Sequence, residues 1–410
     1  MSIYELVENC RICKNSSLEN VLDLGLQPPA NSLTNTANED ISEAPLELMF
    51  CKKCNTVQLS VTVFPGFLFN NYLWVTGTSK GALDYSKFFA DQVLSRTDIN
   101  NPFVIEIASN DGTFLNRFKS RGCKILGVDP ASNIAKEAEK KGVPTINKFF
   151  NYDEALDIKS KFSQADIVIA RNVIPHVKEL DSIVKGIAEL VSSSGLAVIE
   201  FHHSKIILDE LHYDSIYHEH LFYFSVETLS YVFEPYGLKP FDCFQSPISG
   251  GSLVLFLSKE NIEISNDLKR IISEEKNSST NQLDTWQKFA LQSKNHAKEL
   301  SSYIKNIAKS NKIIAYGASA RSSTLLNYCD LSTKEIECII DNNPIKQGLF
   351  TSGTHIPIIS YKQAMPKIKN NTILLLAWNF KEEIINQLRS DGFKGDIIIP
   401  LPNKVHVDEV

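Results

Sequence analysis

The chain repeats one structural plan at two distant places: a buried strand, a loop of small residues, a helix, and a second strand that ends at an aspartate. The first copy runs from Phe103 to Asp129 and the second from Lys312 to Asp341. Strands that alternate with helices at this spacing predict a parallel, doubly wound sheet. With 410 residues the chain is long enough for two or three domains. We therefore expect an α/β protein that contains two Rossmann-like modules.

Two pairs of cysteines near the N-terminus form a predicted metal site. Cys10 and Cys13 belong to one CxxC sequence, and Cys51 and Cys54 belong to the other. Such pairs bring four thiolates into the tetrahedral arrangement that zinc prefers. Because all four positions are filled, no coordination site is left for catalysis, so the zinc is expected to be structural. The alternative is a set of free thiols.

These features divide the chain into three expected parts. They are a small zinc-binding lobe over residues 1–70, a doubly wound central domain over 71–260, and a second Rossmann-like domain over 261–410. In the last part, apolar residues between Leu283 and Ile307 recur at helical spacing, which predicts a connecting helix.

Composition excludes several classes of partner. A net charge of −6 and a pI near 5.9 argue against binding to nucleic acid, which relies on a basic surface. The longest apolar run has the length of a strand, so we expect no membrane span. The N-terminus lacks the basic patch and apolar core of a signal peptide. We expect a cytoplasmic protein that is a monomer or a small homo-oligomer.

The loop of the first module, residues 106–113, predicts a cofactor site. It reads Glu-Ile-Ala-Ser-Asn-Asp-Gly-Thr and opens a helix, where backbone amides and the helix dipole favour an anionic group. The loop lacks the GxGxxG sequence of a dinucleotide site. Its acidic side chains suit the ammonium and sulfonium groups of S-adenosylmethionine. Asp129 ends the next strand and can bind ribose hydroxyls, although it could also act only as a helix cap. The predicted cofactor-binding residues are Glu106, Ala108, Ser109, Asn110, Asp111, Gly112, Thr113, Asp129, Pro130 and Asn172.

Four consecutive titratable side chains, Tyr217-His218-Glu219-His220, lie next to apolar residues. Burying such groups is costly unless they are paired or used in chemistry. A base beside hydrogen-bond donors is what the removal of a proton from carbon requires. The alternative is a structural cluster or a metal site. His176 follows the third strand of the first module and is expected at the same sheet edge as the cofactor.

Together these motifs resemble the nucleotide-sugar 3-C-methyltransferases of deoxysugar biosynthesis, over nearly the whole chain. The resemblance is carried by the two CxxC pairs and by residues 106–115, 127–130, 217–220, 316–320, 324–328, 341–344, 346–348 and 377–379. It implies an N-terminal zinc-binding domain, a central methyltransferase domain and a C-terminal Rossmann-like domain. It also implies a nucleotide-diphosphate 4-keto-sugar as substrate. In that family a base removes the C-3 proton, and the enolate carbon attacks the methyl group of S-adenosylmethionine.

The resemblance also implies roles for individual residues. His220 resembles the catalytic base, and Glu219 would orient or assist it. Tyr217 and His176 would line the sugar pocket and help to hold the enolate oxygen. Tyr72 stands where the family has a tyrosine near the substrate.

The loop of the second module is expected to bind the nucleotide. The turn opens a helix and can present backbone amides to a phosphate, to which Arg321 can add charge. The predicted residues are Gly317, Ala318, Ser319, Arg321 and Asp341. The alternative is a turn that only packs within a degenerate Rossmann unit.

Two departures from the family leave the reaction open. Ser249 stands where the family usually has a histidine, and residues 318–322 read Ala-Ser-Ala-Arg-Ser in place of Ala-Pro-Ala-Lys-Gly. A different sugar, a different nucleotide or altered chemistry would each explain them. The competing hypotheses are methylation of a sugar oxygen or nitrogen, an NAD-dependent oxidoreductase or isomerase, and a zinc-ribbon interaction protein that has lost activity.

Overall fold

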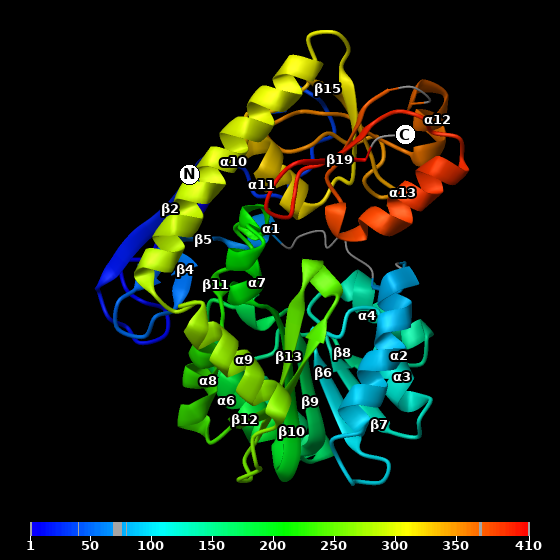
Figure 1. Cartoon of the computed structure of the whole chain (residues 1–410). Helices are drawn as coiled ribbons and strands as arrows, with labels where there is room; N and C mark the ends of the chain where they lie inside the picture. Colours follow the sequence, from blue (N-terminus) through cyan, green and yellow to red (C-terminus); the bar gives the residue numbers. More distant parts are fainter. Residues whose placement is uncertain (1, 40, 69–75, 79, 369–370, 409–410) are drawn as a thin grey trace.

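The structure is a computed structural model that describes residues 2–39, 41–68, 76–78, 80–368 and 371–408. Three parts lie side by side in Figure 1: an N-terminal lobe, a central α/β part and a C-terminal α/β part. The predicted α/β architecture is confirmed. In the described ranges, no helix is long and apolar enough to cross a membrane.

The N-terminal lobe is built from short antiparallel strands. Its strands are β1 (Tyr4–Leu6), β2 (Leu18–Gln27), β3 (Ala44–Cys51), β4 (Val57–Leu59) and β5 (Val61–Val63), followed by α1 (Pro65–Leu68). Strands β2, β3 and β4 form a sheet with β11 (Phe222–Tyr223), which comes from far along the chain. Because β11 directly follows the Tyr217–His220 motif, this sheet ties the motif to the N-terminal lobe.

The central part is a seven-stranded sheet in the order β12-β13-β10-β9-β6-β7-β8. Its strands are β6 (Phe103–Ile107), β7 (Lys124–Val128), β8 (Thr145–Ile146), β9 (Ala165–Arg171), β10 (Val191–His202), β12 (Lys239–Ser246) and β13 (Ser252–Ser258). Its helices are α2 (Lys80–Leu94), α3 (Leu115–Lys119), α4 (Ser132–Lys140), α5 (Tyr152–Phe162), α6 (Leu180–Leu190), α7 (Ser204–Asp209) and α8 (Val226–Phe233), and its short 3-10 turns are η1 (Thr76–Thr78), η2 (Ile174–His176), η3 (Tyr213–Ser215), η4 (Glu234–Tyr236) and η5 (Ile248–Gly250). Strands β6 to β10 are parallel, while β12 and β13 are antiparallel.

The C-terminal part begins with two helices, α9 (Asn266–Asn277) and the long α10 (Leu283–Ile307). A six-stranded sheet follows, in the order β16-β15-β14-β17-β18-β19. Its elements are β14 (Ile313–Tyr316), α11 (Ala320–Tyr328), β15 (Ile336–Ile340), β16 (Ile358–Ile359), α12 (Tyr361–Ile368), β17 (Ile373–Leu375), η6 (Trp378–Phe380), α13 (Lys381–Ser390), β18 (Ile397–Ile399) and β19 (His406–Asp408). Helix α10 runs from this sheet to the N-terminal lobe (Figure 1), where Gln287 donates to Glu19 at 3.1 Å.

Both sheets have a point at which the strand order reverses. In the central sheet the reversal lies between β6 and β9, and in the C-terminal sheet it lies between β14 and β17. Ligands of open parallel sheets bind in the crevice outside the carboxyl ends of the strands at such a point. The loops after β6 and β14 are the two loops selected from the sequence, so both lie where the topology favours a ligand.

Candidate functional site

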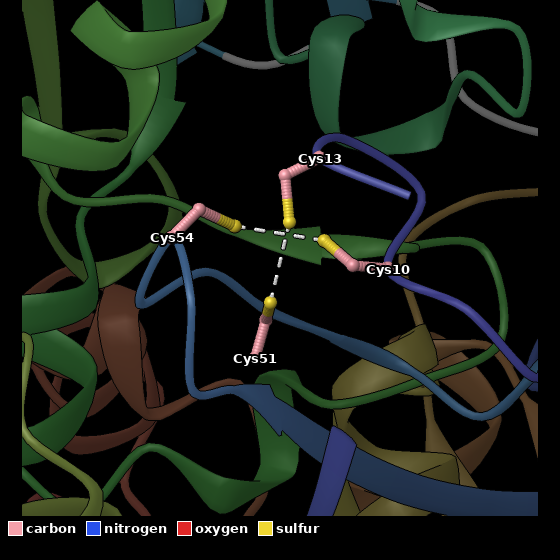
Figure 2. A group of neighbouring side chains, drawn as sticks. All are labelled: Cys10, Cys13, Cys51 and Cys54. Carbon is pink, nitrogen blue, oxygen red and sulfur yellow. Dashed lines mark hydrogen bonds between the residues drawn. The ribbon is translucent and has the colours of Figure 1, made fainter. Parts of the chain in front are cut away.

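The four N-terminal cysteines converge on one point, as Figure 2 shows. The sulfur of Cys10 lies 3.5 Å from that of Cys54, and the sulfur of Cys13 lies 3.5 Å from that of Cys51. Sulfurs about 2.3 Å from a tetrahedral zinc ion are about 3.8 Å apart, so this set fits zinc. Each CxxC is followed by a residue in the left-handed region, Lys14 (φ 60°) or Asn55 (φ 59°). The two knuckles therefore share one turn.

The predicted cofactor loop has an unusual backbone. Ala108 (φ 53°), Asn110 (φ 50°) and Gly112 (φ 73°) all adopt left-handed conformations. Such values are uncommon for residues other than glycine and cluster at ligand sites. Asp129 fixes the loop, because its carboxylate accepts from the backbone N–H of Asn110 and of Ala131, each at 2.9 Å. Burial raises the pKa of Asp129.

Ser109 lies against the next strand. A Cβ atom on Gly127 would stand 2.4 Å from the Ser109 hydroxyl, so only glycine fits there. The hydroxyl itself is buried and has no hydrogen-bond partner among the described residues. A buried hydroxyl with no partner is costly, and a polar ligand at this edge would satisfy it. Asn172 (φ 51°) follows β9 at the same edge, and Pro130 is exposed beside Asp129.

Asp111 and Thr113 stabilise the shape of the loop. The Asp111 carboxylate accepts from the Thr113 hydroxyl at 2.7 Å, from the Gly77 N–H at 3.2 Å and from the Lys141 ammonium at 2.5 Å. Asn110 accepts from the N–H of Thr76 at 3.0 Å. These side chains hold the turn η1 against the loop, so the contacts described for them are internal to the protein.

Glu106 belongs to a buried ion network that the sequence did not reveal. Its carboxylate accepts from the Arg171 guanidinium at 2.9 Å, and Arg171 also lies 3.5 Å from Glu200. Tyr85 and Ser246 donate to Glu200 at 3.0 and 2.6 Å. Burial raises the pKa of Glu106 to about 7. Arg171 directly follows the apolar run Ile167–Ala170, and Glu200 lies within the apolar run from Leu196 to Phe201. These two charges next to apolar residues were the signal that the sequence offered.

Within the Tyr217–His220 motif, His220 is held at both ring nitrogens. Its Nδ1 lies 3.3 Å from the Ser215 carbonyl oxygen, and its Nε2 lies 2.8 Å from the Tyr217 hydroxyl. A carbonyl can only accept, so we assign the proton to Nδ1 and the lone pair to Nε2. The His176 ring stands edge-on to His220 at a centroid distance of 4.6 Å. Burial lowers the pKa of His220 well below its usual range and that of His176 to about 4. Both rings are therefore neutral near pH 7.

The other two members of the motif face the N-terminal lobe. His218 Nε2 lies 3.2 Å from the carbonyl oxygens of Ala44 and of Pro45. The Glu219 carboxylate accepts from the Asn31 amide at 2.6 Å. Glu219 was expected to orient or assist His220, but these described contacts lead to the zinc-binding lobe. The contacts of the motif therefore differ: half-buried Tyr217 and His220 contact each other, and buried His218 and Glu219 contact the N-terminal lobe.

Burial raises the pKa of Glu219 to about 7, which predicts a pH effect on stability. In the unfolded chain the pKa of this carboxyl is 4.5. Between pH 4.5 and pH 7 the folded state therefore binds more protons than the unfolded state. The free energy of unfolding therefore falls as the pH rises, by up to about 3 kcal/mol at pH 8. Glu219→Gln should reduce this loss, as measured by urea denaturation at pH 5 and pH 8. Glu263→Gln, at a side chain that is 91% exposed, is the control. An unchanged pH slope in Glu219→Gln would contradict the assignment.

The predicted nucleotide-binding turn after β14 is tightly built. Gly317 has φ +101°, and a Cβ atom there would lie 2.5 Å from that of Ala377. Ser319 caps α11 by accepting from the N–H of Ser322 at 3.1 Å. Asp341 accepts from the N–H of Ala318 at 2.9 Å, as the equivalent Asp129 does in the first module. These residues shape the turn.

Arg321 is a correction to the expected site. Its guanidinium forms a two-pronged ion pair with Asp214, at 3.1 and 2.7 Å, and both side chains are largely buried. The indole N–H of Trp378 donates to the same carboxylate at 2.9 Å. Arg321 is therefore engaged with an acid from the central part, and a phosphate would have to compete with Asp214. The cation at the turn is Lys346, which donates to the Ala318 carbonyl at 2.7 Å.

Sequence reasoning missed Asp214 as a site residue and quoted Trp378 only as part of a motif. The sequence around Asp214 reads His-Tyr-Asp-Ser and is largely polar, so it gave no signal for a buried ion pair. Tyr72 lies outside the described residues. The backbone of Ser249 lies in η5, and its side chain also falls outside the described part.

Three family models match consecutive stretches of the chain. They are described as a zinc binding domain (residues 10–69), a methyltransferase domain (85–241) and a C-methyltransferase C-terminal domain (247–402). The chain is an S-adenosylmethionine-dependent methyltransferase. Its cofactors are S-adenosylmethionine and a zinc ion, for which Cys10, Cys13, Cys51 and Cys54 are the ligands.

The chain is also similar to individual proteins. The chain is 28% identical to the C-methyltransferase NovU of Streptomyces niveus, over 97% of this chain and 96% of that protein. Among solved structures, it is similar to the magnesium protoporphyrin IX methyltransferase ChlM of Synechocystis, with 12% identity, a TM-score of 0.34, and coverage of 43% of this chain and 80% of that one. The PH0226 protein of Pyrococcus horikoshii is 15% identical, with a TM-score of 0.35 and coverage of 48% and 97%.

Cofactor binding should be visible as thermal stabilisation of this methyltransferase. S-adenosylmethionine at 100 times its Kd should raise the free energy of unfolding by about 2.7 kcal/mol, because it binds the folded state only. NAD should have no such effect, and Asp129→Ala should weaken the response. Asp84→Ala, at a side chain that is 63% exposed, is the matched control. Stabilisation by NAD in place of S-adenosylmethionine, measured by differential scanning fluorimetry, would contradict the cofactor assignment.

Proposed function

We propose that this methyltransferase is a C-methyltransferase that adds a methyl group to C-3 of a nucleotide-linked 4-keto-deoxysugar, with His220 as the base. The observation that carries the proposal is the arrangement of His220. Its Nδ1 faces the Ser215 carbonyl, its Nε2 faces the Tyr217 hydroxyl, and His176 stands beside it. A neutral imidazole with a defined lone pair, in a half-buried site, is suited to accept a proton from carbon.

The reaction follows from the acidity of a carbon next to a ketone. His220 Nε2 takes the C-3 proton, and the electron pair of that C–H bond moves into the enolate. S-adenosylmethionine, when bound, supplies a methyl group that is open to attack by carbon. A new C–C bond forms at C-3, and the bond from the methyl group to sulfur breaks. Once Nε2 is protonated it can no longer accept from Tyr217, so the Tyr217 hydroxyl can then donate to the enolate oxygen. His176, whose ring bonds to the backbone of Glu219, would line the sugar pocket beside it.

The nucleotide, in this proposal, lies against the turn after β14. Support comes from the position of that turn at the reversal point of the six-stranded sheet and from its close backbone approach to Ala377. The N–H groups of Gly317, Ala318 and Ser319 are already donated within the protein. The positive charge offered to the diphosphate would therefore come from Lys346, which lies at the turn. Asp341 fixes the loop from behind, as Asp129 does in the cofactor module.

A panel of nucleotide 4-keto-sugars in deuterated water tests this function. With the correct sugar, mass spectrometry should find one added methyl group on carbon. Without S-adenosylmethionine, deuterium should enter at C-3, because the base acts on the sugar alone. The rival reaction, methylation of a sugar oxygen or nitrogen, needs no carbon base. A methyl group on a heteroatom, with no deuterium at C-3, would overturn the proposal.

A further inference from the structure

The turn η3 and the residues around it precede the base and are held by the C-terminal part. The Tyr213 hydroxyl lies 3.0 Å from Nδ1 of His296 on α10. The carbonyl of Ile216 accepts from the hydroxyl of Thr324 on α11 at 2.8 Å. Tyr213 and Asp214 are almost completely buried. Helices α10 and α11 therefore supply hydrogen-bond partners for the polar groups of residues 213–216.

Asp214 is the most firmly held residue of that segment. Its carboxylate accepts two N–H groups from Arg321 and one from the indole of Trp378. The Arg321 guanidinium also lies 4.4 Å from the centre of the Trp378 ring. A planar guanidinium matches a carboxylate in two places at once, which fixes orientation as well as distance.

Gly250 of the central part packs against the side chains of Arg321 and Trp378. Gly250 has φ +79°, and a Cβ atom there would lie 2.9 Å from the Trp378 ring and 3.1 Å from the Arg321 guanidinium. Only glycine fits at such a position. The ion pair is therefore enclosed by both parts of the protein, where water cannot easily substitute for a lost partner.

Asp214 is connected to the base through the backbone. The next residue, Ser215, carries the carbonyl that accepts from His220 Nδ1 at 3.3 Å. The N–H of the same peptide, on Ile216, donates to the Tyr213 carbonyl at 3.2 Å. The side chain of Ser215 donates to the His212 carbonyl at 2.6 Å. The orientation of this peptide, and with it that of the imidazole, is set by groups on both sides.

We propose that Asp214, Arg321 and Trp378 are positioning residues that orient His220 through the Ser215 carbonyl. This inference rests on the proposed role of His220 as the base. It gives the C-terminal part a task in the proton transfer itself, beyond holding the nucleotide. It also explains why Arg321, in a turn that looks suited to phosphate, is paired with an acid of the central part.

Two substitutions in the full-length protein test the inference. Arg321→Lys keeps the charge but loses the planar fork, and Trp378→Phe keeps the ring but loses the indole N–H. A displacement of a reacting group by about 1 Å can lower a rate about 100-fold, and we expect kcat to fall between about 10-fold and 100-fold. The KM for the sugar nucleotide and the Kd for S-adenosylmethionine should change less than about twofold, since these residues do not contact either ligand in the proposal. Exchange of C-3 hydrogen with deuterium should fall in the same proportion as methylation.

Arg389→Lys is the matched control, because Arg389 pairs with Asp408 elsewhere in the C-terminal part. It should leave kcat unchanged. A rise in KM with constant kcat in Arg321→Lys would overturn the inference and assign Arg321 to the substrate. An equal loss of kcat in Arg389→Lys would also overturn it. If His220→Ala abolishes exchange while both test variants retain it, the positioning role alone fails. If His220→Ala retains exchange, the proposed function itself fails.

Discussion

Replacing His220 with alanine should lower kcat for sugar methylation by about 10²- to 10⁴-fold, the usual contribution of a general base. The imidazole is the group whose Nε2 is set to accept a proton, with Nδ1 directed at the Ser215 carbonyl. In the proposal S-adenosylmethionine is held by the loop after β6 and by Asp129, and His220 acts on the sugar, so the Kd for S-adenosylmethionine should change little. The measurement is product formation together with C-3 deuterium exchange in the absence of S-adenosylmethionine. Exchange that survives in His220→Ala would show that another group is the base.

A control for this variant lies in the same motif. His218 donates to the carbonyl oxygens of Ala44 and of Pro45 and is buried against the N-terminal lobe. His218→Gln keeps a donor and should lower stability without a comparable loss of kcat. The pH profile adds a second check. Burial lowers the pKa of His220 well below its usual range, so the base stays deprotonated as the pH falls from 8 to 6. We expect kcat to remain nearly flat over that interval.

Local sequence patterns were sufficient for the parts of the fold that depend on local physics. Strand β7 ends directly before Asp129, as expected for the second strand of the first module, and helix α10 spans the region in which apolar residues recur at helical spacing, Leu283–Ile307. The four cysteines converge as their spacing predicted. Each of these features depends on short-range periodicity or on turns of a few residues, which a single sequence records directly.

Features that depend on tertiary contacts could not be read in this way. Strand β12 carries Pro240 and Asp242, which are uncommon in strands, and it forms at the edge of the sheet because β13 pairs with it. The partner of Arg321 is Asp214, which lies 107 positions earlier in the chain. Within the Tyr217–His220 motif, the sequence shows which side chains are titratable but not which way each side chain points. Those directions are set by β11, which pairs with β4 of the N-terminal lobe.

Because β11 pairs with β4 of the zinc-binding lobe, we expect activity to depend on the zinc site. Cys51→Ser removes one of the four thiolates, and structural zinc sites contribute about 10–16 kcal/mol of apparent binding free energy in small domains at pH 7. That exceeds the stability of many whole domains, about 5–15 kcal/mol. We therefore expect Cys51→Ser to lose its zinc and to unfold the N-terminal lobe. Metal analysis of the purified protein and limited proteolysis of residues 1–68 would measure both effects.

The loss should reach the base, because the lobe supports the Tyr217–His220 motif from one side. It supplies the Asn31 amide to Glu219, the Ala44 carbonyl to His218 and strand β4 to β11. Without these partners the Tyr217–His220 motif is no longer held in place. The rate of methylation should therefore fall in proportion to the zinc content. No zinc ligand takes part in the proposed reaction. Cys123→Ser is the control, since Cys123 is a buried thiol of the central part, remote from the metal. A zinc-free Cys51→Ser protein with full activity would show that the lobe is dispensable for the orientation of His220.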